Sequence, residues 1–299
     1  MGSQYSAFVS EFVDLASQAL AVEVAASPVA GGDINRGWRI ETSGGDVFFA
    51  KSRAGGSVVE FANEAAGLRW LGEVGSLPVP GVVAVVEDEG EPGLILEWVE
   101  PGPPGDEAEL GRGLALIHQA GAEEFDQLAP GASGDEIRFG QAIVPLCPAP
   151  AGDGFAGVYA ARLRNLSVQA YEEGSLGSSD RDVIELVADR ANQLAGPVEP
   201  PARVHGDLWS GNVLYSDGRP WLIDPAAHGG HRETDLAMLE LFGNPTPAFY
   251  EAYEEVSPLA DGFRERFGFW QLQPLLVHAV LFGGGYGRSA GVTARACLG

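Results

Sequence analysis

The chain has 299 residues, of which 45% are hydrophobic and 20% charged, a composition that indicates a globular protein and excludes fibrous or disordered ones. Its net charge of −24 argues against nonspecific binding to nucleic acid or to an anionic membrane, because both need a basic surface that displaces counterions. Two cysteines cannot form a disulfide scaffold or a tetrahedral zinc site, so we expect a reducing, cytoplasmic environment. The most apolar stretch, residues 272–282, is too short to span a bilayer.

The first hundred residues are predicted to form a mostly antiparallel sheet, with one helix before it and one inserted in it. Apolar residues recur at helical spacing in residues 5–20 and 59–74, whereas the other segments have strand-like patterns separated by Gly-containing turns. The predicted strands are residues 22–29, 35–42, 46–53, 82–87 and 93–99.

Helix is predicted for most of the chain after Pro101–Gly105, whose prolines and glycines mark a break. A β-rich island, residues 203–224, interrupts the helices, and residues 125–155 are Gly- and Pro-rich and are assigned no regular structure. The predicted helices are 108–119, 155–173, 180–194, 232–241, 246–256 and 262–283. This pattern predicts an α+β protein of two lobes, a β-rich one over residues 1–99 and a mostly helical one over residues 100–299.

The strongest chemical signal lies in the β-rich island. The sequence HGDLWSGN begins at His205, and a predicted two-strand hairpin after it ends at Asp224. Phosphoryl transfer from ATP needs a carboxylate that orients the acceptor hydroxyl and oxygen ligands that hold Mg²⁺. Because the spacing matches H-x-D-x-x-x-x-N of the protein-kinase catalytic loop, we predict Asp207 as the base or orienting group and Asn212 and Asp224 as the magnesium ligands. A solvated turn would account for Asp207 alone, but not for the four residues together.

Lys51 is the only lysine in a chain that contains 17 arginines. A site that needs a compact ammonium group resists replacement of Lys by the planar guanidinium of Arg. Lys51 ends the third predicted strand and Glu64 lies 13 residues later in a predicted helix, an order that matches the phosphate-binding Lys and helix Glu of kinases. We therefore predict that Lys51 binds nucleotide phosphates and that Glu64 positions it, with Glu60 as the alternative partner.

Two further segments are candidates for nucleotide contacts. Gly32 and Asn35 lie between the first two predicted strands, where glycine lets backbone N–H groups approach phosphate oxygens, although an ordinary hairpin turn fits the same residues. The segment that joins the two lobes includes Glu97 and Val99, and its backbone would hydrogen-bond adenine. The opposite face of the adenine would contact two apolar residues of the island, Leu214 and Ile223. These two residues fit a role as ordinary core residues equally well.

These residues together resemble the fructosamine kinase (ketosamine 3-kinase) family, whose relatives include the aminoglycoside and choline kinases. The resemblance covers nearly the full chain and implies the two-lobe, protein-kinase-like fold. The H-G-D-x-x-x-x-N core is shared by all small-molecule kinases of this group. Other motifs are more specific to fructosamine kinases, namely Trp209-Ser210, the D-P-A triplet at residues 224–226 and the R-E-T-D-L-A-M run at residues 232–238.

The resemblance implies an enzyme that uses ATP and Mg²⁺ to phosphorylate the 3-hydroxyl of a ketosamine, a fructosamine or ribulosamine formed by glycation of an amine. The phosphorylated adduct is unstable and releases the amine, which is a repair role. Trp209 is implied as a substrate contact, and Asp235 resembles the helix Asp that hydrogen-bonds the catalytic-loop backbone. The chain departs from the family at Asp33, where many members carry Cys, and over residues 134–156, which lack the usual aromatic- and Asn-rich character.

Two other functions fit the same motifs. One is phosphorylation of a different amine-bearing small molecule, such as an aminoglycoside, and the other is nucleotide binding by a scaffolding pseudokinase, which the filled catalytic positions argue against. The acidic surplus adds an expectation, because a ketosamine carries a protonated amine that carboxylates lining the cleft would attract. Glu233 and Glu240, in the helix after the Asp224 loop, are the candidates, with a simply solvated acidic surface as the alternative.

Overall fold

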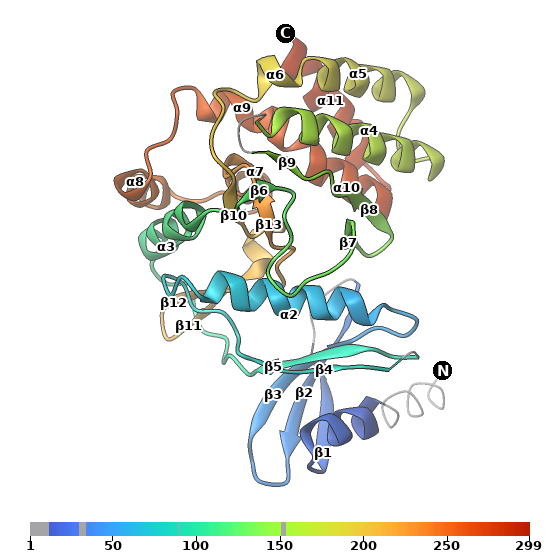
Figure 1. Cartoon of the computed structure of the whole chain (residues 1–299), viewed down its shortest axis with the longest axis vertical. Coiled ribbons are helices and arrows are strands. Elements are labelled where there is room, and N and C mark those ends of the chain that lie inside the picture. The colour runs from blue at the N-terminus through green and yellow to red at the C-terminus, as the bar shows by residue number, and fades with distance from the viewer. Residues whose placement is uncertain (1–11, 30–33, 89, 151–153) are drawn as a thin grey trace.

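The computed structural model describes residues 12–29, 34–88, 90–150 and 154–299. Two parts are visible in Figure 1: a sheet lobe (β1 to β5 with helix α2) at the bottom, and a helical lobe (α3 to α11 with short strand pairs) above it. The predicted α+β class, with one β-rich and one helical part, is confirmed. The exact residue at which the chain divides stays a prediction.

The sheet lobe holds antiparallel strands in the order β1-β2-β3-β5-β4. Side chains alternate along a strand, so β5 directs Leu94 and Leu96 to one face of the sheet and Ile95 to the other. Leu94 and Leu96 pack with Phe61 of α2, whereas Ile95 packs with Phe12 of the helical residues 12–20, so each face is covered by a helix. The elements are β1 (Val24–Val29), β2 (Arg36–Thr42), β3 (Val47–Ser52), α2 (Val58–Gly72), β4 (Val82–Val86) and β5 (Gly93–Glu97).

The helical lobe buries one large apolar core that includes Tyr159, Phe249 and Trp270. Its helices are α3 (Glu107–Ala120), α4 (Ala156–Glu172), α5 (Ser178–Asp189), α6 (Ala191–Leu194), α7 (Glu233–Phe242), α8 (Pro247–Val256), α9 (Phe263–Trp270), α10 (Leu272–Phe282) and α11 (Tyr286–Leu298). Short antiparallel pairs lie among them: β6 (Glu124–Phe125) with β9 (Ala149–Pro150), β7 (Glu136–Phe139) with β8 (Ala142–Pro145), β10 (Ala202–Val204) with β13 (His228–Gly230), and β11 (Val213–Ser216) with β12 (Arg219–Leu222).

Helix α2 takes part in both lobes. Phe61 and Leu68 pack against the sheet, whereas Trp70 and Leu71 belong to the core of the helical lobe. At Gly67 a Cβ atom would lie 3.1 Å from the Cβ of Ala227, so α2 also passes close to the chain that follows β12. The helix therefore connects the sheet to the part of the helical lobe that carries the predicted catalytic residues.

The predicted helices 262–283 and 180–194 are each two helices in the structure. The first divides into α9 and α10 because Pro274 has no N–H to continue the α9 ladder and instead occupies the first turn of α10, where that N–H would have no partner within the helix. The second breaks at Arg190 between α5 and α6.

Two further expectations are met only in part. Residues 125–155, which were assigned no regular structure, contain the β7–β8 hairpin, whose turn holds Gly140 at a φ of 59°. Of the predicted helix 5–20, residues 5–11 lie outside the described residues.

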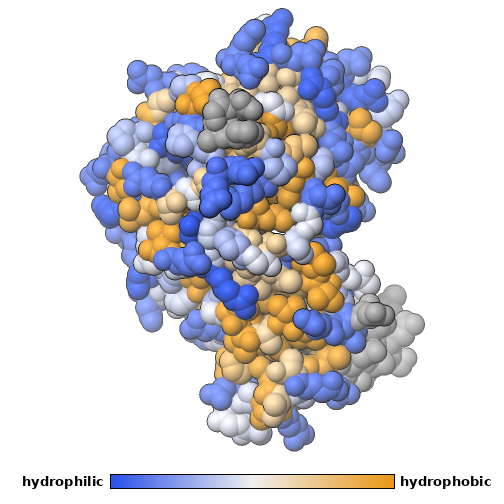
Figure 2. All heavy atoms as spheres, viewed as in Figure 1, coloured by the Kyte–Doolittle hydropathy of each residue, from blue (hydrophilic) through white to orange (hydrophobic). Residues whose placement is uncertain are grey.

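The surface is mixed in polarity. On the face shown in Figure 2, apolar residues gather over the sheet lobe, and hydrophilic residues cover most of the helical lobe. Val83, in the edge strand β4, is 43% exposed. Within the described ranges, the structure contains no helix with the length and apolar character that a membrane span requires.

The packing of α3 against α8 gives a stability prediction. At Gly111 a Cβ atom would lie 2.1 Å from the carbonyl oxygen of Phe249, so we expect Gly111→Ala to lower the free energy of unfolding by about 1–3 kcal/mol. Gly157→Ala is the control, because nothing lies within 4 Å of a Cβ at this α4 position and Ala should stabilise the helix slightly. Denaturant unfolding of both variants checks this, and equal stability of the two would contradict it.

Candidate active site

The single lysine lies where the two lobes meet. Lys51 is in β3, and its side chain is 6% exposed. Its Nζ donates to Oδ1 of Asp224 at 3.0 Å and forms an ion pair with Oε2 of Glu64 in α2. Burial alone would lower the pKa of Lys51, but the charges of Asp224 and Glu64 outweigh it and raise this pKa above its ordinary value. The ammonium group therefore stays charged at neutral pH.

Glu64, rather than Glu60, pairs with Lys51. Glu60 forms its ion pair with Arg53 instead. Burial raises the pKa of Glu64 to about 7, although the charge of Lys51 opposes the shift. Its Oε1 is buried and has no hydrogen-bond partner among the described residues, so the carboxylate reaches the ammonium through Oε2 alone.

The catalytic-loop sequence folds so that Asn212 supports Asp207. A short 3₁₀ helix, Ser210–Asn212, turns the chain back, and Nδ2 of Asn212 donates to the carbonyl oxygen of Asp207 at 2.8 Å and to its Oδ2 at 3.0 Å. Because the amide N–H groups face Asp207, the amide oxygen of Asn212 is the atom suited to a cation. Among the described residues, the side-chain bond from Asn212 goes to Oδ2 of Asp207 and not to its Oδ1.

Asp207 lies in surroundings that disfavour its charge. Burial and then repulsion from Asp224 raise the pKa of Asp207 to about 7, against the opposing effect of the Asn212 hydrogen bond. A carboxylate with a pKa near neutrality can accept a proton during a reaction at neutral pH. Gly206 before it has a φ of 82°, and a Cβ there would lie 2.2 Å from the carbonyl oxygen of Ala226, so this turn requires glycine.

Asp224 follows β12 and offers an oxygen ligand to the same space. Its φ of 54° is uncommon for a residue with a side chain, and its carboxylate is 42% exposed. Asp224 and the amide oxygen of Asn212 form a donor set that fits Mg²⁺, because this ion takes one or two protein oxygens and completes its octahedron with phosphates and water. In the described part of the chain no three His, Cys, Asp or Glu side chains gather into a metal site.

Asp235, near the start of α7, holds the catalytic loop from behind. Its Oδ2 accepts a hydrogen bond from the N–H of His205 at 2.6 Å, and its Oδ1 accepts one from the N–H of Gly206 at 2.9 Å. His118 of α3 contacts the same carboxylate at 3.2 Å. Burial opposes the charge of Asp235, but these partners lower its pKa below the ordinary value. The support of the loop backbone expected from the sequence is confirmed.

The residues predicted to contact adenine lie where the sheet lobe ends and in the β11–β12 hairpin. The N–H of Glu97 donates to the carbonyl oxygen of Gly81 at 2.8 Å, and its carboxylate accepts a hydrogen bond from the N–H of Gly81 at 3.1 Å. Val99 is buried, whereas Leu214 and Ile223 are half-buried. Their roles at adenine stay predictions.

Three other predicted contacts stay predictions as well. Gly32 lies outside the described residues. Asn35 is partly exposed, and its Oδ1 is buried without a hydrogen-bond partner among the residues that the structure describes. Trp209 is 40% exposed and covers Gly211, where a Cβ would lie 2.2 Å from its ring.

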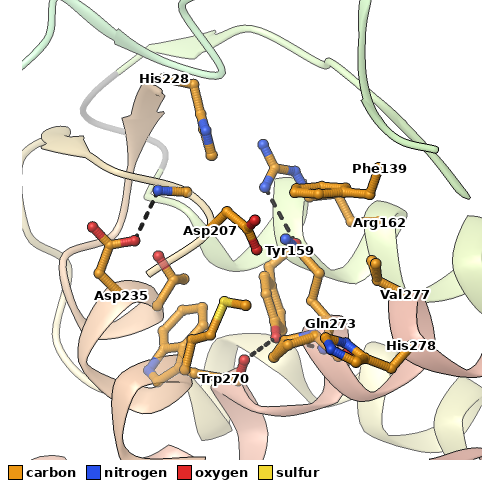
Figure 3. Close-up of a pocket in the computed structure, with 14 residues that line it drawn as sticks. Phe139, Tyr159, Arg162, Asp207, His228, Asp235, Trp270, Gln273, Val277 and His278 are labelled. Carbon is orange, nitrogen blue, oxygen red and sulfur yellow. Dashed lines mark hydrogen bonds between the residues drawn. The ribbon is translucent and has the colours of Figure 1, made fainter. Parts of the chain in front are cut away.

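A small pocket opens beside Asp207 in the helical lobe (Figure 3). Its volume is about 30 Å³, and its lining includes Phe139 of β7, Arg162 of α4 and Gln273 of α10. Arg162 forms a buried ion pair with Asp126 and donates to Oε1 of Gln273 at 3.2 Å, whereas its Nε has no partner among the described residues. Sequence reasoning missed this arginine, although a charged residue among the apolar positions of a helix was a usable signal.

The structure does not place the predicted acidic lining in the pocket. Glu233 is 1% exposed, and its carboxylate binds Arg266 at 2.5 Å and accepts a hydrogen bond from Nε1 of Trp270 at 2.9 Å. Glu240 accepts a hydrogen bond from the hydroxyl of Tyr250 at 2.6 Å, and neither glutamate is among the residues that line the pocket. The prediction for Glu233 is wrong because its buried carboxylate is bound by Arg266 and Trp270, whereas the substrate role of Glu240, whose side chain is 32% exposed, stays a prediction.

Comparison with known proteins identifies the group to which this site belongs. A sequence model described as fructosamine kinase matches residues 6–137 and 154–299. The chain belongs to the fructosamine kinase family. It is 33% identical over 275 residues to a probable ketoamine kinase of Synechocystis, a match that covers 90% of this chain and 89% of that protein. It is also 39% identical to a provisionally named fructosamine-3-kinase of Thermobifida fusca, whose crystal structure matches with a TM-score of 0.83 over 96% of this chain and 98% of that one.

More distant structures show the fold alone. A choline kinase from Streptococcus pneumoniae is 17% identical, with a TM-score of 0.64 over 97% of this chain and 98% of that one. Amicoumacin kinase, solved with AMP-PNP and Ca²⁺, is 14% identical, with a TM-score of 0.60 over 100% of this chain and 95% of that one. The predicted protein-kinase-like fold is therefore confirmed. Family membership makes the chain a phosphotransferase enzyme, a small-molecule kinase, and this class implies the use of ATP.

The contacts of Asp235 give a prediction for the fructosamine kinase site. In Asp235→Asn an amide N–H₂ would face one of the two backbone N–H groups, so we expect kcat to fall by about 10- to 100-fold, the range for a lost hydrogen bond to a charged group. Asp189→Asn, which alters an exposed pair with Arg164, should leave kcat unchanged. Steady-state kinetics on both variants check this, and an unaltered kcat in Asp235→Asn would contradict the supporting role.

Proposed function

We propose that the chain is a ketosamine 3-kinase, which transfers the γ-phosphoryl group of ATP to the 3-hydroxyl of a fructosamine or ribulosamine. Membership of the fructosamine kinase family supports a small-molecule acceptor of this kind. The single observation that carries the proposal is the meeting of Lys51 and Asp224, from two lobes, beside the pocket-lining Asp207. Groups suited to phosphate, to a cation and to an acceptor hydroxyl thereby lie next to one another.

In the proposed reaction each group has one task. Lys51 holds the α- and β-phosphates as a point charge, and Glu64 fixes the direction of its Nζ. Asn212 and Asp224 would hold Mg²⁺, which would supply positive charge to neutralise the transferred phosphoryl group. Oδ1 of Asp207 accepts the hydrogen bond of the acceptor hydroxyl and takes its proton as the hydroxyl oxygen bonds to the γ-phosphorus. The bond from that phosphorus to the β–γ bridging oxygen breaks, and ADP leaves.

The size of the pocket limits how the acceptor binds. The enclosed space of about 30 Å³ beside Asp207 accommodates a group of the size of a hydroxyl, so we propose that one hydroxyl of the ketose is directed to Asp207 there. Arg162 lines the pocket with a buried Nε that lacks a partner among the described residues, and so offers a donor to a sugar oxygen. The amine of the ketosamine would remain outside.

The proposed product defines the biological role. Phosphorylation at O3 would make the ketosamine unstable and free the amine, so the reaction would reverse glycation. We place this repair in the cytoplasm. Both cysteines, Cys147 and Cys297, are free thiols, which supports a reducing compartment.

The acceptor is tested by measuring ADP release from Mg-ATP with a fructosamine, a ribulosamine, an aminoglycoside or free fructose. We expect turnover with one or both ketosamines, with phosphorus NMR locating the phosphate on O3. Asp207→Asn is the control, because Asn keeps the size but cannot take the proton, and transfer should fall by about 10²–10⁴-fold while nucleotide still binds. Phosphorylation of the aminoglycoside alone would replace the proposed acceptor, and undiminished transfer by Asp207→Asn would reject the role of that residue.

Lys51 gives a second prediction. Lys51→Arg should lower kcat/KM for ATP by at least about 100-fold, nearly as much as Lys51→Met, because a planar guanidinium cannot replace a compact ammonium between two carboxylates. Arg112→Lys is the control: Arg112 forms an exposed ion pair with Glu255, and its replacement should leave kcat/KM for ATP unchanged. If the kcat/KM of Lys51→Arg for ATP stays within threefold of the value for the unaltered chain, the ammonium is not required for phosphate binding.

A further inference from the structure

The segment between β6 and β9, residues 124–150, is fastened to the chain that follows Asp224. The N–H of Asp126 donates to the carbonyl oxygen of Gly229 at 2.7 Å, and the N–H of Gly229 donates to that of Gln127 at 2.7 Å. From there the green trace of the segment in Figure 1 runs down to α2 and returns to β7. The segment therefore begins and turns beside elements of the active site.

Segment 124–150 borders the acceptor pocket at Phe139 and, through Asp126, at Arg162. Phe139 lines the pocket, and Asp126 pairs with Arg162, which lines it too. In the turn after β7, a Cβ at Gly140 would lie 3.5 Å from the side chain of Ile34, just before β2. An acceptor at the pocket would therefore lie beside a segment that also reaches the sheet lobe.

One amide binds segment 124–150 to α2. Nδ2 of Asn63 donates to the carbonyl oxygen of Ser133 at 2.8 Å, and Oδ1 of Asn63 accepts a hydrogen bond from the N–H of Ser133 at 2.9 Å. Because both bonds go to one residue, the pair fixes the orientation of the contact as well as its distance. Asn63 directly precedes Glu64, the carboxylate that holds Lys51.

Asn63 lies in the N-terminal half of α2, which packs less against the helical lobe than the C-terminal half does. The α2 residues that pack in the core of the helical lobe, Ala66, Trp70 and Leu71, lie in the C-terminal half of the helix. In the described residues, the only direct hydrogen bonds from the N-terminal half to the helical lobe are the two of Asn63. The half that carries Glu64 is thus held to the helical lobe by the contact with Ser133 in addition to the Lys51 ion pairs that join Glu64 to Asp224.

We propose that Asn63 is a positioning residue, which holds α2 so that Glu64 directs Lys51 to the nucleotide and which makes that alignment depend on the segment bordering the acceptor pocket. The proposal rests on the phosphate-binding role of Lys51 in the proposed function. It concerns the nucleotide side of the site, so it can be tested without any ketosamine.

Gln169→Ala is the control variant, because Gln169 makes the same pair of hydrogen bonds to another residue of segment 124–150. Gln169 of α4 donates to the carbonyl oxygen of Ile143 at 2.6 Å and accepts a hydrogen bond from the N–H of Ile143 at 2.9 Å. Ile143 belongs to the same segment, in β8, but Gln169 ties it to the helical lobe rather than to α2. Gln169→Ala therefore removes the same pair of hydrogen bonds from the same segment, together with one to Oδ1 of Asn165, and leaves the contact of Ser133 with α2 in place.

The test measures the dissociation constant of AMP-PNP with Mg²⁺ by calorimetry on the full chain, together with the melting temperature. We expect Asn63→Ala to weaken AMP-PNP binding by about 5- to 10-fold, the effect of one or two hydrogen bonds of ordinary strength, and Gln169→Ala to weaken it by less than about twofold. Both variants should lower the melting temperature, Gln169→Ala at least as much as Asn63→Ala, because the Gln169 amide is part-buried and makes a third hydrogen bond. Asn63→Asp keeps an acceptor for the N–H of Ser133 but no donor for its carbonyl, so its affinity should lie between those of Asn63→Ala and the unaltered chain.

Two results overturn the proposal. The first is that Asn63→Ala binds AMP-PNP with unaltered affinity. The second is that Asn63→Ala and Gln169→Ala weaken AMP-PNP binding equally, because the hydrogen bonds of Asn63 would then contribute to stability alone. If Asn63→Ala does not fold, Asn63→Asp decides by the same comparison with Gln169→Ala. Failure of the unaltered chain to bind AMP-PNP would reject the nucleotide role within the proposed function, whereas failure to phosphorylate a ketosamine would leave this comparison intact.

Discussion

The ammonium group of Lys51 is buried between carboxylates from two lobes, and the geometry of the site is built around that contact. A buried cation without partners is strongly unfavourable, so Glu64 and Asp224 have to approach it closely. The position of Glu64 then constrains α2, and the position of Asp224 constrains the end of the β11–β12 hairpin. Removing either carboxylate would affect both the charge of the site and the distance between the lobes.

A third carboxylate, that of Asp235, holds the catalytic loop from its opposite side. Asp235 binds two successive backbone N–H groups, which leaves the loop little freedom at Gly206. With the loop held from behind by Asp235 and faced by Lys51 and Asp224 in front, the Asp207 side chain has few orientations available. The arrangement has an energetic cost, because burial and then repulsion from Asp224 raise the pKa of Asp207 and so disfavour its charged form.

Much of this site can be predicted from the sequence because its chemical groups lie in short local motifs. Lys51 stands out as the only lysine, and one short motif with a following Asp names the catalytic loop and the cation ligands. Asn63 cannot be found in this way, since its partner lies 70 residues away and no periodicity links the two, and Arg162 gives only the signal of a charged residue among the apolar positions of a helix. The error at Glu233 has the same cause, because net charge does not tell which carboxylates are paired inside the fold.

The fold, like the site, has parts that local sequence patterns predict and parts that they do not. The α+β organisation follows from the alternation of strands and the spacing of apolar residues, which depend on near neighbours in the sequence. The division of the helical stretch at Pro274 could also be read locally, from the missing N–H of proline. The short pair of β6 with β9 could not, because two-residue strands carry too little pattern to predict their pairing.

The burial of Lys51 has a consequence for the protein's own chemical ageing. Reducing sugars add to neutral, accessible amines, and the one side-chain amine of this chain is 6% exposed and held as a cation by its carboxylate neighbours. Every other basic side chain is a guanidinium or an imidazole. A protein proposed to remove sugars from the amines of other molecules therefore presents no lysine on which the same adduct could form.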